Sequence, residues 1–257
     1  MWPVDEQLVT SLSDPVTKYL PLLAATDPLY QNVRIDDLLD MRSGIQFRDH
    51  DLPWGDKPKA YYCPQLRKRI AELPVNGDVG GRFKYNSYNP IVIGMILEKV
   101  TGMPPARYFE QKLWNKLGME YDGSWSADSD LSMMTKMESG INLRAIDFAK
   151  FGRLLLKKGN WEGEQVVSKA WIDGSTKIDP AHQLSEFGPE IYYENFWWLY
   201  SSDHRNAYII SGWGHLGQYL YVFPENEVII VRMGKEVGGV ESWGKIFKEV
   251  TEFVTLH

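Results

Sequence analysis

The first 190 residues show a spacing of apolar side chains that is typical of helices separated by long loops. Residues 89–101 begin with Asn-Pro, continue as a nearly unbroken apolar stretch and stop before Gly102. This pattern predicts a helix with Asn89 as its N-cap, Pro90 in its first turn and Gly102 after its end. Because the segment is apolar on nearly all sides, we expect the helix to be buried.

Three further segments predict helices that each cover a core with one face. These segments are residues 35–42, 105–117 and about 144–158. In the second of them, Phe109, Leu113 and Leu117 recur every fourth residue and share one side of a helix. A glycine follows each segment within two residues, as glycine often does at helix ends.

After Ala207 the pattern becomes that of strands. Short aromatic and β-branched runs occupy residues 208–210, 219–223 and 228–231, and a four-residue polar connection, 224–227, joins the last two. This arrangement is typical of an antiparallel meander.

Residues 243–254 then place apolar side chains on one helical face, which predicts a closing helix that packs on the sheet. Helices in one block and strands in another predict an α+β fold with an antiparallel sheet. We expect one domain over residues 1–257, with a mainly helical region at 1–190 and the sheet strands and closing helix at 191–257.

Composition excludes several classes of protein. The net charge is −6, from 28 Lys+Arg and 34 Asp+Glu, without basic blocks, so we expect no nucleic-acid partner. One cysteine, Cys63, and five scattered histidines predict neither a disulfide nor a metal site. No nucleotide-binding glycine motif occurs, so no cofactor is expected.

No apolar run approaches the roughly 20 residues that a membrane-spanning helix needs. Residues 1–20 carry acidic side chains where a signal peptide would be apolar. We therefore expect a soluble chain without a membrane span, cytoplasmic if its start is genuine, while the compartment is not otherwise defined.

Residues 83–90 carry more hydroxyl and amide side chains than the packing of a helix requires. In a structural interpretation, Ser87 and Asn89 cap the buried helix and Tyr85 fills a gap with its hydroxyl bonded to the backbone. In a functional interpretation, the same side chains border a catalytic or binding site.

A second segment, residues 211–218, places three glycines around His215 directly before a predicted strand. Glycine lets the backbone approach a ligand closely, and an edge strand after it would offer free N–H groups to an oxyanion. The structural interpretation is a glycine-rich bend with a solvent-facing histidine.

Together these segments resemble the serine β-lactamase-like superfamily, which includes class C β-lactamases, penicillin-binding DD-peptidases and related esterases and amide hydrolases. Five stretches follow one another as they do in that family: residues 12–21, residues 35–44, Tyr85-Asn86-Ser87 with the GMILEKVTGM after it, residues 141–172 and residues 214–235. The resemblance implies a β-lactamase and penicillin-binding-protein-like α+β fold, with helices flanking an antiparallel sheet beside a mainly helical region.

This family transfers acyl groups to the serine of a Ser-x-x-Lys motif, assisted by a Tyr-x-Asn tyrosine and a Lys-Thr-Gly-like strand. The resemblance implies that Tyr85 is a general acid/base, that His215 replaces the lysine as an electrostatic partner and that the Gln218 backbone N–H is an oxyanion donor. Because Ser87 stands where asparagine is usual and the lysine is lost, a small-molecule ester or amide is favoured over a β-lactam. The implied substrate-binding positions are Ser87, Trp213, Gly217 and Gln218.

The nucleophile is not found at its place in the family order. Ser-x-x-Lys would begin a long helix shortly before the Asp-Pro-Val stretch at Asp14, and residues 1–6 resemble the end of that helix. The Ser-x-x-Lys match at residues 242–245 follows the strands, so we interpret Ser242 as a helix cap. We therefore expect the N-terminal strands and the nucleophile helix to be absent, through truncation or a wrongly assigned start.

Three hypotheses follow. The first is a β-lactamase-related serine hydrolase of esterase or amidase type whose nucleophile is not present in this chain. The second is a non-catalytic homologue that binds a peptide, cell-wall or lipid fragment, with Trp197, Trp198 and Trp213 as a stacking wall. The third is that Tyr85 and His215 act with a different base or nucleophile, such as Ser87.

A missing central helix and first strands would expose apolar faces of the helix after Asn89 and of the sheet after Ala207. A folded chain must cover these faces by rearrangement of its own residues, by a second copy in a homo-oligomer, or by a separate N-terminal fragment that complements the fold. The chain alone is expected to be oligomeric, aggregation-prone or inactive toward esters. Its residues do not define the acyl substrate.

Overall fold

The computed structural model describes residues 4–48, 50, 52–240 and 242–256. Its contacts divide the chain into two compact units, each described here by itself. Unit 1 comprises Met1–Asn115 and Gly123–Asn142, and unit 2 comprises Lys116–Asp122 and Leu143–His257. The expected single domain over residues 1–257 stays a prediction.

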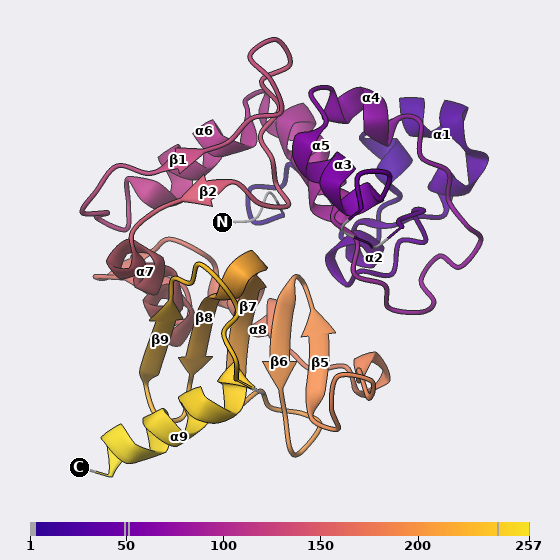
Figure 1. Cartoon of the computed structure of the whole chain (residues 1–257). Coiled ribbons are helices and arrows are strands. Elements are labelled where there is room, and N and C mark those ends of the chain that lie inside the picture. The colour runs from indigo at the N-terminus through magenta and orange to yellow at the C-terminus, as the bar shows by residue number, and fades with distance from the viewer. Residues whose placement is uncertain (1–3, 49, 51, 241, 257) are drawn as a thin grey trace. The chain divides into compact units, whose positions relative to one another are not determined.

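Unit 1 is mainly helical (Figure 1). Its elements are η1 (Val16–Lys18), α1 (Leu22–Thr26), η2 (Pro28–Gln31), α2 (Ile35–Leu39), α3 (Asp56–Tyr62), α4 (Leu66–Ile70), α5 (Tyr88–Thr101), α6 (Pro105–Phe109), η3 (Glu110–Trp114), β1 (Ser124–Trp125) and β2 (Ile141–Asn142).

Helix α5 is the buried centre of unit 1, as its sequence predicts. Its apolar side chains are at most 1% exposed at Ile91, Val92, Ile93 and Ile96. Helices α2, α4 and α6 pack around it. These side chains are covered within unit 1, while the expected homo-oligomer or complementing fragment stays a prediction. The helix ends at Gly102, whose φ of 71° lies in the left-handed region that glycine adopts readily.

The start of α5 differs from the prediction that Asn89 caps it. The helix begins at Tyr88, whose N–H is accepted by the Asn86 side-chain oxygen at 2.9 Å. Asn89 lies inside the first turn and is fully buried. Its amide accepts a hydrogen bond from the Ser43 hydroxyl at 2.7 Å and donates to the Leu38 carbonyl at 3.2 Å. Asn89 thus joins α5 to α2, because its side chain bonds across the core instead of along the helix.

Two other predicted helices are shorter than expected. Helix α2 ends at Leu39 rather than residue 42, because Met41 has a φ of 58° that turns the chain out of the helix. The segment predicted as one helix over 105–117 is regular only to Phe109, after which η3 continues as a π-helical turn.

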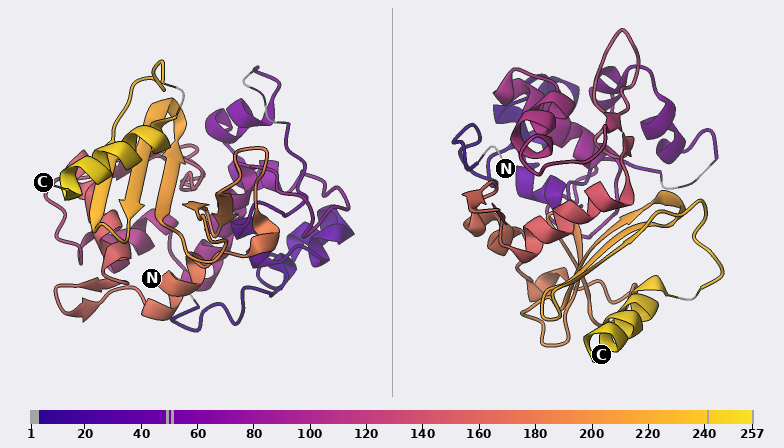
Figure 2. Two further views of the ribbon diagram at one scale, coloured as in Figure 1. Left: turned by 90° about the horizontal axis from the view of Figure 1, so that it is seen from below. Right: turned by 90° about the vertical axis from the view of Figure 1, so that its left-hand side faces the viewer.

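Unit 2 contains a five-stranded antiparallel sheet between helices (Figures 1 and 2). Its elements are α7 (Ala145–Leu156), β3 (Asn160–Trp161), β4 (Glu164–Gln165), α8 (Lys169–Ser175), η4 (Pro180–His182), β5 (Ile191–Glu194), β6 (Trp197–Tyr200), β7 (Ile209–Gly214), η5 (His215–Gly217), β8 (Gln218–Phe223), β9 (Val228–Arg232) and α9 (Trp243–Thr255).

The strand order β5-β6-β7-β8-β9 confirms the antiparallel meander. Strand β8 pairs with β7 on one side and with β9 on the other. The expectation of an edge strand after the glycine segment is therefore wrong, because β9 covers the outer side of β8.

Helices α7 and α9 cover opposite faces of this sheet, as the right-hand view of Figure 2 shows. On the α7 face, Gly152 lies against Ile229 and Val222. On the α9 face, the rings of Phe247 and Tyr221 meet with their centroids 5.1 Å apart. The predicted closing helix is confirmed. Among the described residues, no helix is long and apolar enough to cross a membrane.

Candidate active site

Tyr85 is presented at the start of α5 by a segment that is fixed on both sides. Tyr85 is 40% exposed, whereas Asn86 and Tyr88 are buried. The Lys84 N–H donates to the Met41 carbonyl at 2.8 Å, and the Asn86 amide donates to the Ile45 carbonyl at 2.9 Å. Because the flanking residues are anchored, the backbone at Tyr85 is held at a defined position on the surface of unit 1.

Ser87 occupies the N-cap position of α5 without acting as a cap. Its backbone is already helical, with φ −63° and ψ −16°, and its side chain makes no capping hydrogen bond. Asn86 supplies the cap instead. The half-buried Ser87 hydroxyl is therefore not needed to begin the helix, which leaves the functional interpretation open.

A charged network lies behind the first turn of α5. The Tyr88 hydroxyl lies 3.2 Å from both the Asp56 carboxylate and the Arg69 guanidinium, and Arg69 donates to Asp56 at 2.7 Å. Burial raises the pKa of Tyr88 to about 12. Burial also acts to raise the pKa of Asp56, but hydrogen bonds from the Arg48 N–H and Arg69 outweigh it and lower that pKa. The network keeps Asp56 ionised and Tyr88 neutral.

In unit 2, the predicted glycine segment forms the end of the β7–β8 hairpin. Gly214 pairs with Gln218, and His215, Leu216 and Gly217 make the turn between them. His215 is exposed at the tip. Gly217 is buried with a φ of 81°, and its carbonyl accepts a hydrogen bond from the Arg232 guanidinium at 2.7 Å. A Cβ at this position would lie 2.9 Å from the Glu236 carbonyl oxygen, and together with the positive φ this contact favours glycine there.

The direction of each backbone N–H along β7 follows from the ladder. The Ser201 N–H donates to the Glu190 carbonyl on the β5 side. Backbone groups alternate in direction along a strand, so those of Trp198 point the other way, toward its β7 partner Ser211. Since the backbone N–H of Ser211 points toward β6, the same alternation directs the N–H of Gly212 toward β8 and the N–H of Trp213 away from β8.

The pairing of β6 with β7 stops at Trp198 and Ser211, two residues before Trp213. Within the described part of the chain, the Trp213 N–H has no backbone acceptor. It is a strand donor that the sheet does not use.

The Trp213 ring, in contrast, is engaged in packing. It stacks on Trp198 with a centroid distance of 4.2 Å and an interplanar angle of 8°. Its indole N–H donates to the Ser211 hydroxyl at 3.0 Å, and that hydroxyl donates to the Trp198 carbonyl at 3.0 Å. These contacts fix the backbone of β7 just before the hairpin tip.

The predicted site residues thus fall into two groups. Tyr85 and Ser87 lie together in unit 1. The other group, in one hairpin of unit 2, comprises Trp213, His215, Gly217 and Gln218. Sequence reasoning missed Asn86 as the cap of α5 and the backbone of Trp213 as a donor. The alternation of strand residues was the signal for the second, but it needed the pairing register.

The Ser-x-x-Lys match at residues 242–245 has a structural role. Ser242 is the N-cap of α9, and its hydroxyl accepts the Lys245 N–H at 3.4 Å. The interpretation of Ser242 as a helix cap is confirmed.

One pair of metal-binding side-chain types lies close together in unit 2. His182 Nδ1 is 2.9 Å from the carboxylate of Glu194, which also accepts the Asp179 N–H at 2.9 Å. The prediction of no metal and no cofactor stays a prediction.

Comparison with known proteins places this fold and these motifs in one family. The family model described as beta-lactamase matches residues 4–251, so the chain belongs to the beta-lactamase family. The 6-aminohexanoate-dimer hydrolase of Paenarthrobacter ureafaciens is 29% identical over 244 residues, which cover 86% of this chain and 59% of that protein. The chain therefore spans about three fifths of the length of this relative.

Solved structures show the same fold. A putative 6-aminohexanoate-dimer hydrolase from Bacillus anthracis has a TM-score of 0.83 at 18% identity, covering 98% of this chain and 68% of the other. EstCE1, a hydrolase with promiscuous acyltransferase activity, has a TM-score of 0.73 at 15% identity, covering 98% of this chain and 80% of the other. The predicted β-lactamase and penicillin-binding-protein-like α+β fold is confirmed.

Proposed function

We propose that this chain is the Tyr85- and hairpin-bearing part of a β-lactamase-related serine hydrolase that cleaves small-molecule esters or amides. The observation that carries the proposal is Tyr85, which is exposed between the buried residues Asn86 and Tyr88 at the start of α5. Membership of the beta-lactamase family and the names of the relatives support acyl transfer as the chemistry.

Within this proposal, Tyr85 relays the proton between the serine nucleophile and the leaving group. The oxyanion donor is better assigned to the Trp213 N–H than to Gln218. Gln218 pairs with Gly214, and the ladder directs the Gln218 N–H toward Gly214 inside the hairpin. The Trp213 N–H points away from β8, at a position where β6 no longer pairs with β7. His215 remains the proposed electrostatic partner, and Ser87 and Gly217 the proposed substrate-binding positions.

The nucleophile is proposed to come from residues that this chain does not contain. Ser242 is occupied as a cap, and it lies on α9 after the strands. Ser87 does not act as the cap of α5, and its hydroxyl makes no hydrogen bond to a basic side chain among the described residues. A serine of the Ser-x-x-Lys type elsewhere in the protein is the assignment that agrees with the family chemistry.

The alternative of a binding homologue with a tryptophan wall has less support. Trp198 is 6% exposed, and its ring is covered by Trp213. A wall for stacking on a ligand needs an open ring face. These two side chains stabilise the sheet instead.

The test uses the protein expressed with the codons upstream of Met1, so that a Ser-x-x-Lys encoded there is supplied. We expect Tyr85→Phe to lower kcat for p-nitrophenyl butyrate by at least about a hundredfold, with KM little changed, because general acid/base catalysis contributes roughly that much.

Tyr121→Phe is the matched control, since Tyr121 is 42% exposed and lies outside both proposed groups. It should keep its activity within about twofold. Full activity of Tyr85→Phe would overturn the assigned role, and the absence of ester and amide hydrolysis from the extended protein would overturn the proposed function.

A further inference from the structure

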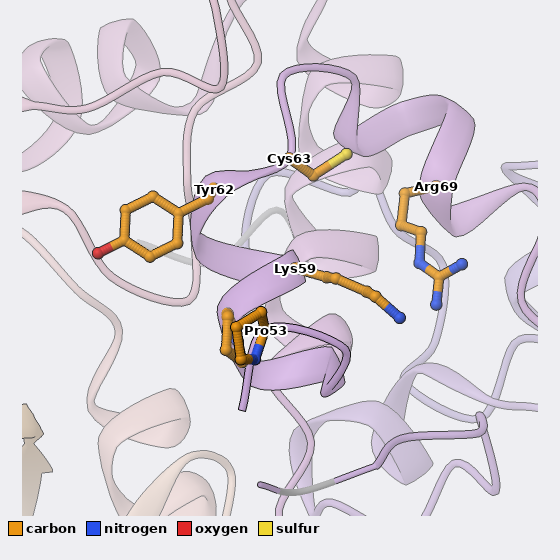
Figure 3. A pocket seen from close by; sticks show the side chains of 6 residues that line it. Pro53, Lys59, Tyr62, Cys63 and Arg69 are labelled. Carbon is orange, nitrogen blue, oxygen red and sulfur yellow. The ribbon is translucent and has the colours of Figure 1, made fainter. Parts of the chain in front are cut away.

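Unit 1 contains a pocket that the proposed catalytic roles do not use. It has a volume of about 640 Å³, which is within the range of small-molecule sites. Its lining residues are Pro53, Pro58, Lys59, Tyr62, Cys63 and Arg69. They come from α3, from α4 and from the chain before and between these helices (Figure 3).

The pocket combines apolar walls with two cationic groups. Pro53, Pro58 and the ring of Tyr62 supply hydrocarbon surface. The Lys59 and Arg69 side chains extend to the same side of the pocket, as Figure 3 shows, while Tyr62 points to the other side. This arrangement suits a ligand with a hydrocarbon body and a negatively charged end.

Arg69 is held rigidly but keeps a donor. Its Nε and one terminal nitrogen are engaged by Tyr88 and Asp56, at 3.2 and 2.7 Å. Its other terminal nitrogen makes no hydrogen bond to a described residue. Because Asp56 and Tyr88 fix the guanidinium plane, binding through the remaining N–H groups would cost little side-chain entropy.

Lys59 has no carboxylate partner within the described part of the chain. Its ammonium donates one hydrogen bond, to the Trp54 carbonyl at 2.7 Å, and an ammonium has three donors. Arg69 is neutralised by Asp56, whereas the charge of Lys59 is not balanced. The three charged groups therefore sum to one positive charge, which a single carboxylate would neutralise.

We infer that this pocket binds a small monocarboxylate with a hydrocarbon body, with its carboxylate between Lys59 and Arg69.

The experiment measures binding alone, so it does not depend on catalysis. Hexanoate, hexylamine and 1-hexanol share one chain length and differ in end-group charge, and each is titrated into the purified chain by amide NMR. We expect saturable shifts of α3 and α4 resonances with hexanoate, and at least tenfold weaker binding of hexylamine and hexanol.

Two variants locate the charge. Lys59→Met should weaken hexanoate binding about tenfold, and Lys59→Glu should reverse the preference in favour of hexylamine. Lys68→Met is the matched control, because Lys68 is an exposed α4 lysine that does not line the pocket, and it should bind as the unmodified chain does.

Equal binding of hexanoate and hexylamine, no saturable binding of hexanoate, or an unchanged affinity in Lys59→Met would each overturn the inference. None of these results bears on Tyr85, and a loss of ester hydrolysis in Tyr85→Phe would not alter hexanoate binding. The failure of the pocket assignment is thus distinguishable from the failure of the proposed function.

Discussion

Glu138 lies in an environment that disfavours its charged form. One of its carboxylate oxygens accepts a hydrogen bond from Ser139 at 3.2 Å, while the other is buried without a partner among the described residues. Burial raises the pKa of Glu138 to about 7, and the nearby Lys136 only partly opposes this effect. At neutral pH the folded chain therefore holds a carboxyl group that resists ionisation.

The consequence is a loss of stability as pH rises. The pKa of Glu138 is about 7 in the folded chain and 4.5 in its ordinary state, so the folded state binds the proton more tightly. The free energy of unfolding should fall between pH 4.5 and 7, by about 3 kcal/mol from this group at 1.36 kcal/mol per unit.

We expect Glu138→Gln to flatten this fall, because the amide has no charge to bury. Urea unfolding at pH 5, 6, 7 and 8 measures the free energy of unfolding at each pH, and Glu249→Gln, a change at an exposed glutamate, is the control. Parallel profiles for Glu138→Gln and the unmodified chain would contradict the assignment.

At the scale of elements, the contact of α7 with the sheet depends on Gly152. A Cβ at this position would lie 2.7 Å from an Ile229 methyl and 3.2 Å from a Val222 methyl. The absence of a side chain therefore lets the helix approach β8 and β9 closely. Gly174 in α8 is different, since a Cβ there would meet nothing within 4 Å.

We predict opposite effects of the same substitution at these two positions. Gly152→Ala should lower the free energy of unfolding by about 1–3 kcal/mol, because overpacking forces the helix away from the sheet. Gly174→Ala should raise it by about 0.5–1 kcal/mol, because alanine favours the helix without a clash. Urea denaturation of both variants measures this pair of effects. Gly152→Ala at or above the stability of the unmodified chain would show that α7 does not pack as described.

The elements were largely predictable from sequence because periodicity reports burial directly. The apolar stretch before Gly102 predicted α5, and the apolar face at residues 243–254 predicted α9. The cap of α5 was not predictable, because Asn86 and Asn89 are equivalent as residue types and only the packing against α2 decides which one bonds across the core.

At the scale of the whole molecule, the candidate site was predictable as segments but not as geometry. The Tyr85 segment and the glycine hairpin could be recognised in the sequence, and both lie at the ends of the elements predicted for them. The direction of the Trp213 N–H depends on the register of β6, β7 and β8, which residue types alone do not define. The pocket lined by Lys59 and Arg69 could not be predicted from the sequence either, since it forms where two short helices meet.

The two proposed groups belong to different units, since Tyr85 lies in unit 1 and the β7–β8 hairpin in unit 2. The chain also spans 59% of its hydrolase relative. The central claim is therefore that these 257 residues contribute the tyrosine and the oxyanion strand, while the serine nucleophile is supplied from outside them.

The most direct test of this claim is fluorophosphonate labelling of the purified 257-residue chain, followed by peptide mapping, with circular dichroism to establish that the sample is folded. We predict no covalent label on any serine, Ser87 and Ser242 included, and no hydrolysis of p-nitrophenyl esters above the buffer rate. A folded chain that labels stoichiometrically at one of its own serines and turns over the ester would contradict the account.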